Sequence, residues 1–334
     1  MFISRSFLLS LFLVADICAA YRDAYANSSL FRRVDYDTAP TTTEIFSTGT
    51  AGDDGICSEA QITTIDSFLE EVWLLHHAAL TAYSEHQTDL GYRMLFTTYL
   101  GVGFDDEEVD DFSAGFMDSI LDRLNAVSQF LYREGLIDPV TTEKPYIFCG
   151  DAFATYAPWD QPAKDSSGNT IPDGTDDNGD IVYIKVNQVF PAESQRAGWI
   201  AFWLSIFNAY TFDIGTSTST MCSRSDRFAA TSKASTQYPA QLVTGGTYDR
   251  HTFLCDATFD PIGNGKQTHS VAELATIISY DGYPVEGNGK GLDQYGTYSS
   301  TLYHEIIHLT DSAGTTGDPF GRFYSFPFVR WPPC

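Results

Sequence analysis

Two histidines near the C-terminus constrain the local fold more than any other feature of this sequence. His304 and His308 stand four residues apart in the run HEIIH. Residues with this spacing project from one face of an α-helix, so both imidazoles can reach one metal ion. Serine and threonine at 299–301 can cap the helix, and the apolar residues around the histidines can bury its remaining surface. The pattern therefore predicts a helix over residues 299–309 that carries a metal site.

Glu305 adds a reactive group to this candidate metal site. It stands one step round the helix from His304, where its carboxylate can take a proton from metal-bound water. Zinc lowers the pKa of such a water toward neutrality, and a carboxylate base then helps to deliver hydroxide to a peptide carbonyl. We therefore expect His304 and His308 to be zinc ligands and Glu305 to be a general base. The competing interpretation is an ordinary helix that happens to carry two histidines.

A catalytic zinc ion needs a third protein ligand, and the residues after the helix restrict the choice. Residues 309–334 contain no His and no Glu, and no Cys before the last residue. Only Asp311 and Asp318 remain. An unbroken helix would carry Asp311 nearly two turns beyond His304, out of reach of the metal. Asp318 follows a glycine-containing turn at 314–317 that lets the chain reverse, so Asp318 is the expected third ligand and Asp311 the alternative.

The N-terminal residues indicate export from the cell. Residues 1–20 combine one basic residue, an apolar run and small residues at the end, as in a signal peptide. That apolar run is too short to cross a bilayer, as is the apolar stretch at 199–207, which we expect in the core. Residues 21–56 are polar and predict either a short pro-segment cut after the dibasic pair at 32–33 or a disordered N-terminal segment. We therefore expect a secreted, extracellular protein with no membrane partner.

The cysteines fit an oxidising compartment, in which most thiols form disulfides. Five cysteines remain beyond the signal peptide, so one of them is left over. Their wide spacing lacks the close pairs of a structural zinc site. We expect Cys57 to pair with Cys149 and Cys222 with Cys255, which leaves Cys334.

The acidic composition restricts the class of partner. The formal net charge is −25. Nucleic acid requires a basic surface, so it is excluded as a partner. A protein or peptide substrate is the expected partner, and the acidic surface is compatible with cationic sites in it, although solubility alone explains such a charge.

The hydrophobic pattern changes its period along the chain and predicts an α+β fold. Residues 160–180 are rich in Asp, Gly, Pro and Ser; their aspartates could hold calcium, but the spacing does not match an EF-hand, and a solvated loop is expected. The remaining expected elements are helices at 58–80, 109–131, 270–280 and 299–309 and strands at 146–149 and 181–189. Together they suggest one α+β domain over residues 57–334.

Two segments of the chain resemble the aspzincin metalloendopeptidases, the deuterolysin-like secreted enzymes of fungi. The family pattern is H-E-x-x-H followed by G-T-x-D-x-x-Y-G, and the chain has HEIIH followed by GTTGDPFG at 314–321. Near the N-terminus, CSEAQ at 57–61 and FTTYL at 96–100 are similar to the start of the family's catalytic domain. The resemblance spans about residues 57–321, and only the HEIIH helix is specific.

The resemblance implies a zincin-like metalloprotease domain, mainly helical with a small sheet, that hydrolyses peptide bonds and in one branch prefers lysine-containing sites. It carries over His304 and His308 as zinc ligands, Glu305 as catalytic base and Asp318 as third ligand. The chain departs from the family pattern at two places, because Gly317 stands where the family has its aspartate and Phe320 where it has its tyrosine; Tyr324 could replace the tyrosine. These departures leave open an alternative, a secreted zinc-binding protein or antigen with an impaired peptidase site.

Overall fold

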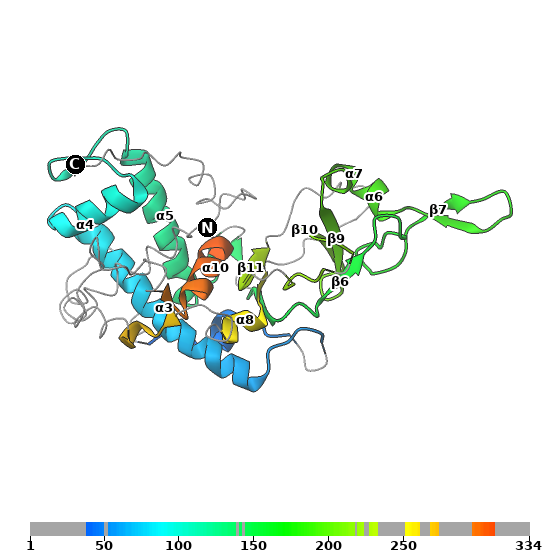
Figure 1. Ribbon diagram of the computed structural model, residues 1–334, viewed down its shortest axis with the longest axis horizontal. Coiled ribbons are helices and arrows are strands. Elements are labelled where there is room, and N and C mark those ends of the chain that lie inside the picture. The colour runs from blue at the N-terminus through cyan, green and yellow to red at the C-terminus, as the bar shows by residue number, and fades with distance from the viewer. Residues whose placement is uncertain are drawn as a thin grey trace. The chain divides into compact units, whose positions relative to one another are not determined.

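The computed structural model combines helices with several small sheets (Figure 1). It describes residues 38–49, 53–137, 140–141, 144–217, 219–223, 227–232, 251–260, 268–273 and 296–310. Contacts divide the chain into two compact units, and the division falls within the first long helix. The first unit comprises Met1–Pro40, Phe68–Thr142 and Gly265–Cys334, and the second comprises Thr41–Ser67 and Glu143–Asn264.

The first unit is mainly helical. Its helical elements are α3 (Glu59–Glu85, shared with the second unit), α4 (Leu90–Leu95), the π-helical turn η3 (Phe96–Leu100), α5 (Ala114–Leu131) and α10 (Ser300–Thr310). Its strands form three pairs: β1 (Phe104–Asp105) with β2 (Glu108–Val109), β3 (Leu136–Ile137) with β4 (Val140–Thr141), and β13 (Thr268–His269) with β14 (Gly296–Thr297). The first two pairs are antiparallel and the third is parallel. Helix α10, orange in Figure 1, lies against α5.

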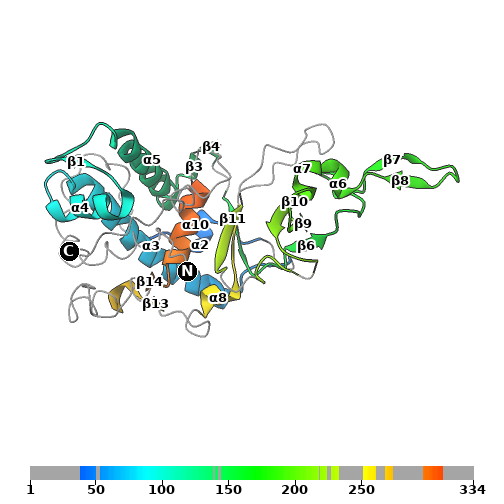
Figure 2. The same ribbon diagram turned by 45° about the horizontal axis from the view of Figure 1, so that its top comes forward.

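The second unit carries the larger sheets. Its helices are α2 (Thr42–Ile45), α6 (Val186–Val189), α7 (Pro191–Ser194) and α8 (Asp256–Phe259). Its strands are β5 (Tyr146–Cys149), β6 (Ala154–Ala157), β7 (Pro172–Thr175), β8 (Ile181–Tyr183), β9 (Trp199–Leu204), β10 (Ala209–Ile214), β11 (Ala229–Ser232) and β12 (His251–Leu254). One sheet has the order β10-β9-β6 and is antiparallel; the other has the order β11-β12-β5, with β12 and β5 parallel. The β7–β8 hairpin projects from this unit (Figure 2).

Local sequence signals set the two long helices of the first unit. Ser58 and Gln61 begin α3 by a reciprocal cap, in which each side chain accepts a hydrogen bond from the backbone N–H of the other. The helix predicted at 58–80 is confirmed and runs five residues further. The helix predicted from 109 begins later, at Ala114, because Val109 belongs to β2 and the Asp110 carboxylate accepts the N–H of Ser113 just before the helix.

Two predictions in the second unit are wrong in part. The strand expected over 181–189 ends at Tyr183, and α6 follows, because the Gln188 side chain accepts the N–H of Lys185 and starts a helical turn. The loop expected over 160–180 contains the strand β7. The carboxylate of Asp176 closes the β7–β8 hairpin by accepting two backbone N–H groups, both at 2.9 Å. The run of apolar residues at 181–184 continues as Val186 and Val189, so apolar residues alone do not mark where the strand ends.

The N-terminal part of the described chain is packed, not disordered. The backbone N–H and the hydroxyl of Thr42 donate to Asp66 at 2.6 and 2.7 Å. Ile45 and Phe46 are buried, and Ser47 forms a parallel bridge with a residue of β5. The disordered interpretation is therefore wrong for residues 38–49. The signal peptide and the dibasic pair at 32–33 lie outside the described residues.

Both predicted disulfides are confirmed. Cys57 is bonded to Cys149 and Cys222 to Cys255, and Cys334 lies outside the described residues. The apolar stretch at 199–207 contributes the buried strand β9, as expected of core. Every helix in the described part of the chain is too short or too polar to cross a bilayer. The two disulfides fit a protein that folds in an oxidising compartment.

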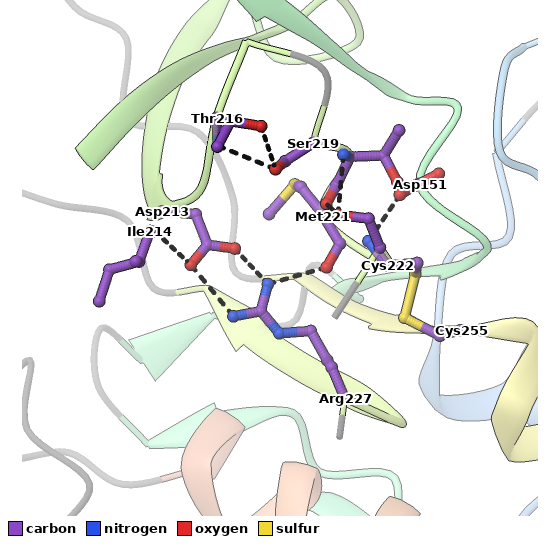
Figure 3. A network of polar contacts seen from close by, with 11 residues as sticks. Asp151, Asp213, Ile214, Thr216, Ser219, Met221, Cys222, Arg227 and Cys255 are labelled. Atoms are coloured by element: carbon purple, nitrogen blue, oxygen red, sulfur yellow. Dashed lines mark hydrogen bonds and ion pairs between the residues drawn. A yellow bond between two sulfur atoms is a disulfide. The ribbon is translucent and has the colours of Figure 1, made fainter. Parts of the chain in front are cut away.

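A polar network fixes the loop that carries Cys222 in the second unit (Figure 3). Arg227 forms a two-pronged ion pair with Asp213, with one N–H···O distance of 3.0 Å, and also donates to the carbonyl of Met221 at 2.8 Å. Asp151 accepts the backbone N–H of Cys222 at 2.6 Å. The side chains of the ion pair are 15% and 16% exposed, so the Arg227 guanidinium and its partner are largely removed from water.

Replacing this guanidinium is expected to destabilise the second unit. Arg227→Ala leaves Asp213 mostly buried without its counter-charge and should lower the free energy of unfolding by about 2–3 kcal/mol. Arg196→Ala is the matched control, because Arg196 is exposed and its guanidinium rests on Trp199, a contact worth about 0.5–1 kcal/mol. Urea unfolding followed by tryptophan fluorescence measures both. Equal losses in the two variants would contradict the role given to the ion pair.

Candidate metal centre

The structure brings the two histidines of the HEIIH run together on α10. The Nε2 atoms of His304 and His308 lie 2.9 Å apart, and the rings are steeply inclined, with an interplanar angle of 81°. Both side chains are half-buried. The predicted helix over 299–309 is confirmed as Ser300–Thr310. One helical face therefore presents two imidazole nitrogens to the same point.

The spacing of these nitrogens suits a zinc ion. Zinc binds histidine nitrogen at about 2.0–2.1 Å with tetrahedral angles, which places two ligating nitrogens about 3.3 Å apart. The observed 2.9 Å is a few tenths of an ångström shorter, a difference that small side-chain rotations remove. The same spacing accommodates one N–H···N hydrogen bond between two neutral imidazoles. The pair therefore fits zinc as two of its ligands.

Glu305 lies on the inward side of α10. Its side chain is only 5% exposed, and its Oε2 atom is fully buried. Glu305 therefore adjoins His304 in the sequence, and its carboxyl group lies inside the first unit.

The described residues supply two ligands and no more. Among them, no three His, Cys, Asp or Glu side chains gather into a group that could hold a metal. The two candidates for the third ligand, Asp318 and Asp311, lie outside the described residues, as do Phe320 and Tyr324. The third ligand therefore stays a prediction from the sequence.

The start of α10 is held by contacts that the sequence did not reveal. The Ser300 hydroxyl donates to the carbonyl of Thr297 at 2.7 Å. From α3, the Glu71 carboxylate accepts the N–H of Val271 at 3.0 Å. Burial raises the pKa of Glu71, and its contacts with Ser299 and Val271 partly oppose this rise. Glu71 thus places a partly buried carboxyl group beside the N-terminus of α10, where a helix dipole favours negative charge.

A fully buried histidine connects helices α3, α5 and α10 of the first unit. His76 on α3 is 0% exposed; its Nδ1 lies 3.1 Å from the hydroxyl of Tyr303 on α10, and its Nε2 lies 2.8 Å from the hydroxyl of Ser128 on α5. Burial, and then the neighbouring His77, hold the pKa of His76 well below its usual value. Burial also raises the pKa of Tyr303, so its hydroxyl stays protonated. The sequence gives no local signal for this contact.

The buried state of His76 predicts acid sensitivity. Its pKa is lower in the folded chain than in the unfolded chain, so below about pH 6.5 only the unfolded chain takes up the proton. The contribution of His76 to the free energy of unfolding should therefore be fully present above pH 6.5. Below this pH the free energy of unfolding should fall by about 1.4 kcal/mol per pH unit. The half-buried His77, whose pKa is also lowered by burial, adds in the same direction.

Urea unfolding of His76→Gln between pH 5 and pH 7.5 isolates the His76 contribution. Glutamine cannot take up a proton, so the stability difference between wild type and variant should narrow as the pH falls. A difference that stays constant across this range would show that His76 does not bind its proton preferentially in the unfolded chain.

The comparisons with known proteins identify no relative of this chain. No family model, no curated protein and no solved structure matches the chain. The resemblance to aspzincins therefore remains an expectation, carried by the HEIIH run on α10 and by residues 314–321, which lie outside the described residues.

Proposed function

We propose that this chain is a secreted zinc-dependent endopeptidase of the aspzincin type. The observation that carries the proposal is the 2.9 Å separation of the Nε2 atoms of His304 and His308 on one helix. Glu305, the residue after His304, is buried on the same helix. His304 and His308 would hold the zinc ion together with Asp318, or Asp311 in its place. Bound zinc supplies a Lewis acid for the peptide carbonyl and lowers the pKa of a water molecule.

The protein residues would supply positioning and proton transfer. Glu305 takes a proton from the attacking water through its carboxylate and then returns it to the leaving amine, acting first as base and then as acid. The substrate would lie extended beside the strand that precedes Ser299, where backbone hydrogen bonds can hold it. Signal-like residues at 1–20 and the two disulfides support action outside the cell.

A second candidate function is zinc binding without effective turnover. The sequence favours it at two positions, because Gly317 and Phe320 replace the aspartate and tyrosine of the family pattern. Phe320 has no hydroxyl that could stabilise a developing oxyanion. The zinc-binding and peptidase functions share His304 and His308 as ligands and differ in whether the bound zinc supports turnover.

Removal of zinc with a chelator, followed by addition of zinc, tests the proposed peptidase activity. The chain, collected from culture medium, is assayed for casein cleavage before and after removal of zinc. Cleavage that disappears with the chelator and returns with about one equivalent of zinc supports the proposal. Zinc bound tightly without cleavage would favour the binding function, and no zinc bound would contradict both.

The third ligand can be assigned by two aspartate variants. Asp318→Ala is expected to weaken zinc binding by about two powers of ten, because it removes one of three protein ligands. Asp311→Ala should leave the zinc affinity within about threefold of wild type, since an unbroken helix from His304 to residue 311 would hold that side chain away from the metal. Competitive titration with a chromogenic chelator measures both. The reverse result would make Asp311 the ligand.

A further inference from the structure

We propose that His76 is a positioning residue that sets the rotation of α10, and with it the direction of His304 and His308, through its contact with Tyr303. The inference rests on the proposed zinc function of this helix. It assigns a role to a buried polar group that neither metal binding nor catalysis uses directly.

Three helices each contribute one member of this contact. His76 comes from the middle of α3, Ser128 from the last turns of α5 and Tyr303 from the second turn of α10. The hydroxyl oxygens of Tyr303 and Ser128 lie 3.1 and 2.8 Å from the two ring nitrogens of His76. All three side chains are buried, so water cannot replace either partner. The imidazole therefore has both of its nitrogens committed.

The chemistry of a neutral imidazole gives this contact a direction. It has one N–H donor and one lone-pair acceptor, so one hydroxyl must donate to His76 and the other must accept from it. The lowered pKa of His76 keeps the ring in this neutral form. A rotation or slip of α10 that moved the Tyr303 hydroxyl away would leave Nδ1 of His76 buried without a hydrogen bond, which is unfavourable. The contact thus favours one rotational setting of the helix.

The position of Tyr303 makes that setting relevant to the metal site. Tyr303 immediately precedes His304, and consecutive residues on a helix point about 100° apart. With Tyr303 directed into the unit, His304 and His308 take the half-buried face and can converge. Support of this kind fixes ligand geometry more closely than the ligands can by themselves.

The chain offers a matched control on the same helices. His77, the next residue of α3, makes a similar contact: its Nε2 lies 3.2 Å from the hydroxyl of Tyr132, which follows α5. Neither member of that contact belongs to α10. Removing the Tyr132 hydroxyl therefore removes a histidine–tyrosine contact between α3 and the end of α5 in which α10 takes no part; this contact is half-buried, whereas that of His76 is fully buried.

The experiment compares Tyr303→Phe and Ser128→Ala with Tyr132→Phe in the full chain. Zinc affinity is measured by competition, and the visible absorption of the Co²⁺ form reports ligand geometry. We expect Tyr303→Phe and Ser128→Ala each to weaken zinc binding about tenfold and to change the Co²⁺ spectrum. Tyr132→Phe should change neither. Ser128→Ala keeps the test decisive if Tyr303→Phe does not fold, since it removes the other hydroxyl that His76 contacts and leaves the Tyr303 side chain in place.

The outcomes separate this inference from the proposed function. A wild-type chain that binds no zinc contradicts the proposed function. A wild-type chain that binds zinc, with unchanged affinity and Co²⁺ spectrum in both Tyr303→Phe and Ser128→Ala, overturns the positioning role alone. Equal losses in Tyr303→Phe, Ser128→Ala and Tyr132→Phe would also overturn it, because they would trace to general stability.

Discussion

Glu305→Gln is expected to keep its zinc and to lose about 10²–10⁴-fold in the rate of peptide hydrolysis. Glutamine has the size and shape of glutamate and can occupy the same buried position, where the Glu305 side chain is 5% exposed. It cannot accept the proton of the attacking water, and general acid–base catalysis typically contributes a factor of this order. Turnover of a fluorogenic peptide under saturating conditions, together with the zinc content of the same sample, measures the effect.

Glu70→Gln is the control for this substitution. Glu70 is an exposed residue of α3, so the same chemical change there should leave turnover and zinc content as in wild type. Loss of zinc together with activity in Glu305→Gln would indicate that Glu305 supports the metal site and does not act as its base. Full activity with bound zinc would contradict the catalytic role given to Glu305.

His304→Ala is expected to reduce zinc affinity by about two to three powers of ten. A zinc site in a protein binds its metal with about 10–16 kcal/mol, so each of three or four ligands accounts for about 3–4 kcal/mol. His308→Ala should have an effect of the same size, because the two Nε2 atoms face each other at 2.9 Å and would share one ion. Competition with a chelator of known affinity measures each variant.

The double variant His304→Ala/His308→Ala sharpens this test. Two ligands of one ion do not act independently, so the double variant should lose much less than the sum of the two single losses. Two bound zinc ions in wild type, one of them lost in each single variant, would point to two separate metal sites. Single variants with wild-type affinity would show that α10 holds no zinc.

Local patterns carried the predictions that the structure confirms. The spacing of apolar residues and the Ser58 cap indicated α3, and the HEIIH run with serines before it indicated α10. Periodicity and capping act within a few residues, so they are visible in one sequence. The start of α5 and the strand expected at 181–189 were wrong for the same reason: apolar residues recur there, but nearby side-chain contacts set the boundaries.

The spacing of residues in the sequence could not predict the contacts around the candidate site, because their members lie far apart in the chain. His76 meets Tyr303 across 227 residues and Ser128 across 52 residues. Nothing local distinguishes His76 from His77, which makes a different contact. Glu71 resembles any other glutamate of α3 until the fold brings Val271 to it. By contrast, the His304 and His308 pair could be found at once, because both members lie on the same short helix.

The zinc content of the purified full chain tests the central claim most directly. After equilibrium dialysis against buffer with a low micromolar concentration of zinc, elemental analysis should find about one zinc ion per wild-type chain. The same analysis should find almost none in His304→Ala/His308→Ala. A wild-type chain without zinc, or a double variant that holds as much zinc as wild type, would contradict the assignment of His304 and His308 as its ligands.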